Sequence, residues 1–285
     1  GAMETVTLGP AGTYSHRAAT AVADGDISFA ESVRGIVDAV ADGRADRGVV
    51  PIENSIEGSV TETLDALADT DLAVVREVVT PIRHALLAQE SSFSVVASHS
   101  QALAQCREYL DEHHSDATRK AVASTARGVE LAREDSSVAA IAHPDNAAGS
   151  QPAGSQTPSG QPDETLRVLA EDIQDRTSNA TRFFVVAPAS KRSEAGGKSS
   201  FVVYPNANYP GLLLELLEPF ADRDINLSRV ESRPSGERLG DYVFHIDVAS
   251  GLYEQRTRDA VADLEAIASA GWVRKLGSYD TEHVA

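Results

Sequence analysis

A polar triplet stands directly before an apolar segment that is typical of a buried strand. Asn179, Thr181 and Arg182 lead into the run Phe-Phe-Val-Val at residues 183–186. An amide, a hydroxyl and a guanidinium at the mouth of a strand can hydrogen-bond a polar substrate or bind a carboxylate. Far upstream, the turn Gly-Pro-Ala-Gly at residues 9–12 offers a second wall for such a site. The two segments are therefore candidates for one polar site.

Three polar loops, at residues 9–15, 53–59 and 98–101, each lie beside a predicted helix start. Free backbone N–H groups and the helix dipole favour carboxylates and phosphates at such places. Taken singly, Ser and Thr residues there are usually N-caps worth about 1 kcal/mol, without a ligand. Three such loops together with Thr181 and Arg182 indicate a cleft that binds an anion. The loops match neither a P-loop nor a dinucleotide-binding glycine motif, and no cofactor is expected.

The chain is acidic and poor in lysine. Its net charge is -18 over 285 residues, and only four of its 25 basic residues are Lys. Nucleic-acid binding is not expected, because Lys and Arg on phosphates supply most of that affinity. The composition resembles that of proteins from salt-loving organisms, where molar salt shortens the Debye length to about 3 Å and screens carboxylate repulsion. An ordinary acidic protein is the alternative.

Residue counts narrow the class further. The eight histidines show no ligand-type spacing with cysteine or acidic partners, so no metal site is expected. The single cysteine, Cys106, cannot form an internal disulfide and fits a reducing cytoplasm. No apolar stretch of membrane-spanning length and no signal segment occurs, so we expect a cytoplasmic protein without membrane contact. A Gly-x-Ser-x-Gly motif of serine hydrolases is also missing.

Alternating strand and helix patterns before residue 190 predict an α/β fold with at least some parallel strands. Strands are expected at residues 6–8, 48–52, 73–79, 84–87, 93–97, 121–123, 138–141, 166–170 and 182–187, and helices at 15–23, 33–40, 101–113 and 125–134. The stretch 143–164 is rich in Gly, Ser, Pro and Gln. We expect it to form a mobile surface loop, because it has few apolar residues to bury.

A compact second unit follows the polar linker at residues 190–198. Its expected strands and helices occur in the order βαββαβ, which is the ferredoxin-like arrangement. The strands are expected at residues 200–204, 225–233, 242–248 and 272–276, and the helices at 211–222 and 253–270. In the first of these helices, the side chains expected to face inward are Leu213, Leu216, Leu217 and Phe220.

Four motifs follow one another along the chain. They are Gly-Pro-Ala-Gly-Thr-Tyr-Ser at residues 9–15, Val-Pro-Ile-Glu-Asn-Ser-Ile-Glu-Gly at 50–58, Ser-x-Ser-Gln-Ala-Leu at 98–103 and Asn-x-Thr-Arg-Phe at 179–183. In this order they resemble the prephenate dehydratase family. Asn226-Leu227 and the sequence Glu-Ser-Arg-Pro at 231–234 resemble the ACT domain that this family carries at its C-terminus. Ser100 departs from the family pattern, which usually has proline there.

The resemblance implies a fold and a domain organisation. Residues 3–190 are expected to form a catalytic domain of two α/β lobes similar to periplasmic binding proteins, and residues 199–285 a regulatory ACT domain. The chain would cross to the second lobe near Pro81 and return near residue 180. On this interpretation Gly12 and Thr13 share a lobe with Thr181 and Arg182, and face the helix start at residues 98–101 across a cleft.

The resemblance also implies an activity, the conversion of prephenate to phenylpyruvate in phenylalanine biosynthesis. Thr181 is the expected catalytic residue, as a hydrogen-bond donor to the departing hydroxyl. Arg182 either clamps a substrate carboxylate or pairs structurally with acidic residues, and both interpretations stay open. Glu53 and Glu57 would repel a dianion, so cap or turn roles are expected for them. The other expected substrate-binding residues are Thr13, Ser15, Asn54, Ser55, Ser98, Gln101 and Phe183.

The C-terminal unit is expected to bind phenylalanine between two copies and to inhibit the enzyme, within a homodimer or homotetramer. A pure dimerisation module is the alternative. The residues that the resemblance assigns to phenylalanine binding are Tyr209, Gly211, Leu212, Leu213, Asn226, Leu227, Glu231, Ser232, Arg233 and Pro234.

Two rival functions remain at this point. Arogenate dehydratase acts on the aminated analogue of prephenate, and the sequence does not separate the two substrates. A non-catalytic amino-acid-binding regulator could use the same pair of lobes, although the intact sequence Thr181-Arg182-Phe183 argues against it. No chorismate mutase-like helical segment precedes Val6, so we expect a single activity.

Overall fold

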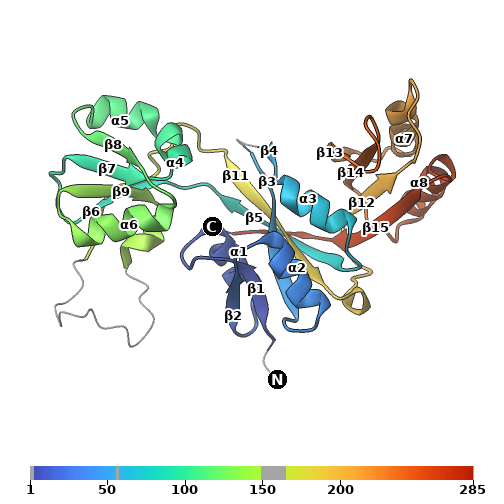
Figure 1. Cartoon of the computed structure of the whole chain (residues 1–285), viewed down its shortest axis with the longest axis horizontal. Coiled ribbons are helices and arrows are strands. Elements are labelled where there is room, and N and C mark those ends of the chain that lie inside the picture. The colour runs from blue at the N-terminus through green and yellow to red at the C-terminus, as the bar shows by residue number, and fades with distance from the viewer. Residues whose placement is uncertain (1–2, 56–57, 149–164, 285) are drawn as a thin grey trace. The chain divides into compact units, whose positions relative to one another are not determined.

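The computed structural model describes residues 3–55, 58–148 and 165–284, and the chain divides into two compact units (Figure 1). The first unit comprises Gly1–Gly9, Ser15–Thr80 and Thr181–Ala285. The second comprises Pro10–Tyr14 and Pro81–Ala180. The first unit therefore contains the entire C-terminal βαββαβ segment together with both ends of the preceding α/β part. Within the described ranges, no helix combines the length and the apolar character needed to cross a bilayer.

The α/β part of the first unit is built on a seven-stranded sheet with the order β16-β5-β11-β3-β1-β2, in which β4 also pairs with β3. β1 is parallel to β2 and β3, whereas β11 is antiparallel to β3. Its strands are β1 (Thr5–Leu8), β2 (Ile27–Ala30), β3 (Arg47–Asn54), β4 (Gly58–Ser59), β5 (Ala73–Pro81), β11 (Ala180–Ala187) and β16 (Thr281–His283), and its helices are α1 (Tyr14–Val22), α2 (Val33–Ala41) and α3 (Thr61–Ala68).

The packing of α2 shows how the sequence builds this layer. Ser32 caps the helix by accepting a hydrogen bond from the Gly35 N–H at 3.0 Å. The buried face carries Val33, Ile36, Val37, Ala39 and Val40, and it contributes to the core of the unit. A Cβ atom on Gly48 of β3 would lie 2.5 Å from a methyl carbon of Ile36. Glycine at that position therefore allows the helix to approach the sheet closely.

The C-terminal domain has the predicted βαββαβ order. Its sheet order is β13-β14-β12-β15, and α7 and α8 pack on one face around Phe201, Phe220 and Ile246. The opposite face contributes Val202, Val243 and Tyr279 to the hydrophobic core of the α/β part. The elements are η2 (Ala189–Lys191), β12 (Lys198–Tyr204), α7 (Leu212–Ala221), β13 (Leu227–Pro234), β14 (Tyr242–Val248), α8 (Gln255–Ile267) and β15 (Trp272–Tyr279).

The second unit contains a five-stranded sheet with the order β10-β6-β9-β7-β8. β7 is parallel to both β8 and β9, and β6 is antiparallel to β9 and β10. The elements are β6 (Ala85–Ala88), β7 (Val95–Ser98), α4 (Ser100–Gln105), α5 (Arg107–His113), β8 (Thr118–Ala121), α6 (Thr125–Glu134), β9 (Val138–Ala142), η1 (Pro144–Ala148) and β10 (Arg167–Ala170). Of the predicted loop at residues 143–164, the part 149–164 lies outside the described residues.

The structure corrects two expectations about placement. Gly12 and Thr13 belong to the second unit, whereas Thr181 belongs to the first. The cause lies at Tyr14, whose hydroxyl accepts from the Arg83 N–H at 3.0 Å and donates to the Arg83 carbonyl at 2.9 Å. Leu213 was expected to face inward on α7, but 41% of it is exposed. Leu212 is buried at the start of that helix instead, together with the predicted Leu216.

Candidate functional site

Thr181 and Asn54 lie side by side, although 127 residues separate them in the sequence. They are register partners at the end of β3 and the start of β11, and the Asn54 side-chain amide donates to Thr181 Oγ1 at 3.4 Å. The Thr181 carbonyl accepts a bond from the Thr80 hydroxyl at 3.4 Å. Thr181 is 9% exposed, so its hydroxyl is held on a nearly buried strand end. Two of the predicted site motifs therefore meet in space.

A bulge immediately after Arg182 interrupts the pairing of these two strands. Arg182 pairs with Glu53, but Phe183 pairs with Pro51, so the register shifts by one residue. The residue skipped in the pairing is Ile52 of β3, which follows Pro51, and proline has no N–H to donate to the ladder. Phe183 is fully buried beyond the bulge. The bulge separates Thr181 and Arg182 from the regular strand that follows.

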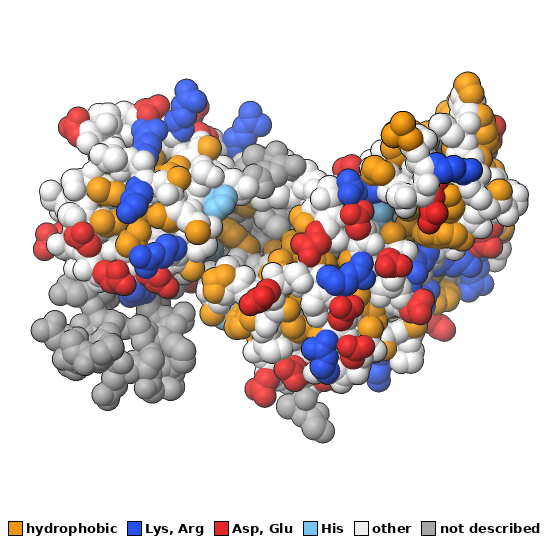
Figure 2. Space-filling model, in the orientation of Figure 1, with side chains coloured by type: hydrophobic (Ala, Val, Ile, Leu, Met, Phe, Trp, Pro, Cys, Tyr) orange, Lys and Arg blue, Asp and Glu red, His pale blue; other side chains and the backbone are white. Residues whose placement is uncertain are grey.

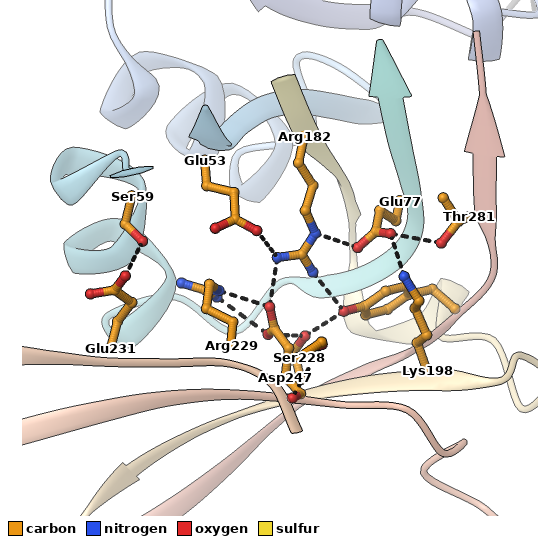
Figure 3. A network of polar contacts seen from close by, with 12 residues as sticks. Glu53, Ser59, Glu77, Arg182, Lys198, Ser228, Arg229, Glu231, Asp247 and Thr281 are labelled. Carbon is orange, nitrogen blue, oxygen red and sulfur yellow. Dashed lines mark hydrogen bonds and ion pairs between the residues drawn. The ribbon is translucent and has the colours of Figure 1, made fainter. Parts of the chain in front are cut away.

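The Arg182 guanidinium uses all three of its nitrogen atoms on protein acceptors (Figure 3). Nε donates to Glu77 at 2.5 Å, and one terminal nitrogen donates to Glu53 at 3.1 Å and Asp247 at 2.7 Å. The other donates to the Tyr279 hydroxyl at 3.2 Å. Only 13% of the Arg182 side chain is exposed. These contacts support the structural interpretation of Arg182, and its role as a carboxylate clamp stays a prediction.

Arg182 belongs to a larger cluster that we call the interdomain ion network, defined as Glu53, Glu77, Arg182, Lys198, Arg229 and Asp247. Arg229 donates to both carboxylate oxygens of Asp247, at 2.7 and 3.2 Å. Lys198 donates to Glu77 at 2.9 Å. The network contains three cations and three carboxylates, drawn from β3, β5, β11, β12, β13 and β14. It therefore joins the α/β part of the first unit to the C-terminal domain through balanced charges.

The network keeps Asp247 and Glu77 ionised. Burial alone would raise the pKa of Asp247, but the charges of Arg229 and Arg182 outweigh burial and hold that pKa at about 2. Burial also acts to raise the pKa of Glu77, and the charge of Arg182 with hydrogen bonds from Thr281 and Lys198 brings it below its ordinary value. Loss of one partner would leave a buried charge without compensation, which is far more costly than the loss of an exposed pair.

In the second unit, the expected residues Ser98 and Gln101 have different surroundings. Ser98 is fully buried and donates to the Ile141 carbonyl at 2.8 Å, so its hydroxyl ties β7 to β9. Gln101 is exposed at the start of α4. The residue that caps this helix is His99, whose Nδ1 accepts from the Gln101 N–H at 3.2 Å. This capping role of His99 has no counterpart among the residues predicted from the sequence.

The remaining expected substrate-binding residues are spread over both units. Thr13 lies in the second unit, while Ser15 and Ser55 lie in the first. Ser15 is the second residue of α1, and its carbonyl accepts from the Thr7 hydroxyl at 3.5 Å. Ser55 is an exposed turn residue directly after β3. Glu53 contacts Arg182, whereas Glu57 lies outside the described residues. Binding roles for Thr13, Ser15 and Ser55 stay predictions.

Two carboxylates of the interdomain ion network were missed at the sequence level. Glu77 lies within the Val-rich strand β5, and Asp247 lies between Ile246 and Val248 of β14. Both side chains are 1% exposed. A carboxylate inside an apolar strand requires a buried cation, because an isolated buried charge is too costly. A single carboxylate within an apolar strand was therefore the sequence pattern that could have indicated these buried ion pairs.

Two of the expected phenylalanine-binding residues contact the α/β part of the first unit. Glu231 accepts a bond from the Ser59 hydroxyl at 2.8 Å. Arg233 binds Asp65 of α3 through two parallel bonds of 2.9 Å each. Leu212 and Leu227 pack in or against the core of the C-terminal domain, and Tyr209 donates to Glu215 at 2.6 Å. The assignment of these residues to phenylalanine remains a prediction.

His245 is a buried histidine on the face of the C-terminal sheet that packs against the α/β part of the first unit. It lies on β14 in register with Glu231 and is 1% exposed, and neither ring nitrogen has a hydrogen-bond partner among the described residues. Burial is the largest cause that lowers its pKa, to about 4, and the charge of Arg229 adds to this effect. His245 is therefore neutral at physiological pH.

The fold and the site define a class of protein: an α/β protein of periplasmic-binding-protein type with a ferredoxin-like domain at its C-terminus. A family model of prephenate dehydratase matches residues 5–191, and an ACT-domain model matches residues 207–266. The chain thus belongs to the prephenate dehydratase family.

Individual relatives agree with this assignment. A bifunctional chorismate mutase/prephenate dehydratase of Aquifex aeolicus is 35% identical over 277 residues, which cover 95% of this chain and 72% of that protein. The prephenate dehydratase of Methanocaldococcus jannaschii is 35% identical over 281 residues, 95% of each protein. The crystal structure of an Arthrobacter aurescens prephenate dehydratase in complex with L-Phe matches with a TM-score of 0.84 and 38% identity, over 98% of this chain and 90% of that one.

Proposed function

We propose that this chain converts prephenate to phenylpyruvate, water and carbon dioxide. The observation that carries the proposal is the pairing of Thr181 with Asn54 at the end of two strands. Because Asn54 donates to Thr181 Oγ1, the threonine hydroxyl can direct its own proton toward a substrate oxygen. Membership of the prephenate dehydratase family supports the choice of substrate.

The chemistry needs few protein groups. As the carboxylate carbon leaves as carbon dioxide, the electron pair of the broken C–C bond enters the ring and expels the ring hydroxyl. The hydroxyl takes up a proton to leave as water, and the ring becomes aromatic. Threonine is a weak acid, so Thr181 acts as an aligned hydrogen-bond donor that stabilises the charge developing on the leaving oxygen.

Substitution of Thr181 tests this proposal. Thr181→Ala should lower kcat about 100- to 1000-fold, which is the typical effect of removing one such donor. Thr181→Ser keeps the hydroxyl and should retain substantial activity. Both variants should be assayed with prephenate and with arogenate, at high salt, alongside their thermal unfolding. Equal kcat of the alanine variant and the wild-type protein would overturn the assignment of Thr181. Preferential turnover of arogenate would show that arogenate, and not prephenate, is the substrate.

We further propose that phenylalanine binds the ACT domain and inhibits the enzyme. The related Arthrobacter aurescens structure is described as a complex with L-Phe. The proposed contacts come from the α7 start, from Asn226 directly before β13, and from β13 itself, which supplies Ser232 and Pro234. Inhibition requires that phenylalanine bind two states of the protein with different affinity. Calorimetry without heat of binding at high salt would refute the sensor role.

Assembly through the ACT domain is the accompanying proposal. Figure 2 shows hydrophobic side chains on the part of the domain where α7 lies. Tyr209, Leu213 and Leu214, at and just before the start of α7, are exposed, as is Leu239 between β13 and β14. Exposed apolar groups of this kind mark protein contacts. We propose a homodimer or homotetramer in a salt-rich cytoplasm. Light scattering after size exclusion, at low and at molar salt, measures the assembly, and a monomer at all concentrations would contradict it.

A further inference from the structure

We propose that Asp247, a residue of the ACT domain, is a positioning residue for Thr181. The inference rests on the proposed dehydratase function and names a group that acts on Thr181 through Arg182. Asp247 lies on β14 between Ile246 and Val248, both of which face the core of the ACT domain. Its own side chain lies on the other face of the strand, toward the interdomain ion network.

Asp247 connects two arginines that otherwise have different surroundings. One carboxylate oxygen accepts from Arg182 at 2.7 Å and from Arg229 at 2.7 Å. The other accepts from Arg229 at 3.2 Å and from the Ser200 hydroxyl at 2.6 Å. Figure 3 shows the carboxylate between the two guanidinium groups. The bond to Arg182 is a direct link between the ACT domain and the strand that carries Thr181.

Anchoring of Arg182 also orients Thr181, because the two residues are adjacent and both precede the register shift between β11 and β3. Neighbouring side chains of a strand point to opposite faces, so an anchored Arg182 directs the Thr181 hydroxyl to the opposite side. Glu53, Glu77 and Asp247 fix the guanidinium from three different strands. Loss of one of these anchors allows the start of β11 to shift. A misplacement of about 1 Å at a catalytic group costs about 100-fold in rate.

Variants that change the charge balance of the network can distinguish a positioning role of Asp247 from a role in the stability of the fold. With Asp247 present, three carboxylates face Arg182, Arg229 and Lys198. Asp247→Asn leaves three buried or half-buried cations with two carboxylates. The double variant Asp247→Asn/Arg229→Gln restores equal numbers, two of each sign. It therefore removes the uncompensated charge without restoring the carboxylate anchor of Arg182.

Steady-state kinetics with prephenate at high salt test the proposal. Asp247→Asn should lower kcat about 10- to 100-fold with a much smaller change in KM, because binding groups outside β11 are untouched. The matched control is Asp71→Asn, which removes a different ion pair between the same two domains, that with Arg274 at 3.4 Å, at an exposed position. This control should keep wild-type kcat.

The double variant distinguishes positioning from folding. It should recover most of the thermal stability that Asp247→Asn loses, while its kcat stays low. If the single variant does not fold, the kcat of the double variant still tests the proposal. Recovery of kcat together with stability would show that Asp247 is merely structural and would overturn the proposal.

A second measurement does not depend on turnover. Hydrogen exchange of the peptide that contains Thr181 should be faster in Asp247→Asn than in Asp71→Asn, because the start of β11 is less firmly held. An inactive wild-type protein would refute the proposed function. Equal kcat and equal exchange in the two variants, with an active wild type, would refute the positioning role alone.

Discussion

Acid sensitivity of the protein should depend on His245, and replacement of that residue by glutamine tests the expectation. The imidazole is buried on the face of the ACT sheet that meets the α/β part. The charged groups that act on it are Arg229 and Arg233 of β13, Asp247 of its own strand and Asp65 of α3. Burial and the two arginines lower its pKa, and the two aspartates act in the opposite direction but do not compensate.

The size of the effect follows from the pKa. It falls from an ordinary 6.5 to about 4 in the folded protein. Between these values the unfolded chain binds a proton that the folded protein does not, so the free energy of unfolding decreases as the pH falls. At about 1.36 kcal/mol per pH unit, the loss from this residue approaches roughly 3 kcal/mol at pH 4. For a protein of this size the corresponding decrease in Tm is on the order of 5–10 °C.

Thermal unfolding of wild-type protein and His245→Gln, measured from pH 7.5 to pH 4 in molar salt, provides the assay. The glutamine variant differs in stability at neutral pH, but glutamine does not titrate, so its Tm should depend much less on pH between 6.5 and 4. His283→Gln, which replaces an exposed histidine, is the control and should follow the wild-type curve. If His245→Gln loses as much Tm over this range as the wild-type protein, the reasoning is wrong.

Two further predictions concern contacts between the ACT domain and the α/β part. Gly277 has φ +151°, and a Cβ there would lie 2.2 Å from the Val74 carbonyl oxygen of β5; Gly277→Ala should therefore destabilise the protein by at least about 2 kcal/mol in chemical denaturation. A wild-type midpoint for that variant would contradict the close approach. Asp65→Ala should cost less than about 1 kcal/mol, because both side chains of its ion pair with Arg233 are substantially exposed and salt screens them. A loss above about 2 kcal/mol in molar salt would show that the pair is not screened as its exposure implies.

Local patterns predicted much of the fold. The predicted helix at 125–134 is α6, and the alternating strand at 242–248 is β14. Both have strong periodicity and clear ends, with Ser124 capping α6 through the Arg127 N–H. The βαββαβ order was confirmed for the same reason. The strands β2 and β16 were missed because they have only four and three residues, and β16 is held by β5, a partner distant in sequence.

The helix predicted at 101–113 shows where local reasoning fails. It is divided into α4 and α5 at Cys106, because Asp175 forms hydrogen bonds with backbone groups of both helices. The Asp175 N–H donates to the Gln105 carbonyl at 2.7 Å, and its carboxylate accepts from the Glu108 N–H at 3.2 Å. Periodicity carries no information about such a distant insertion.

The candidate site was predictable as a set of residues but not as an arrangement. The motifs indicated Thr181 and Asn54, whereas their direct pairing depends on the antiparallel register of β3 and β11. The sequence left two interpretations of Arg182, and its distant partners Glu77 and Asp247 support the structural one. These partners come from separate strands, so no local pattern could connect them with Arg182.

The strand order of the first unit also bears on how the chain folds during synthesis. β5 pairs with β11 on one side and with β16 on the other, and both are made later. A ribosome that synthesises the chain from its N-terminus therefore releases β5 with two open edges, until first β11 and finally residues 281–283 emerge. Residues 81–180 contain every strand of the five-stranded sheet, which can form in the meantime. The sheet that carries Thr181 thus gains β16 only after all four strands of the ACT domain have been synthesised.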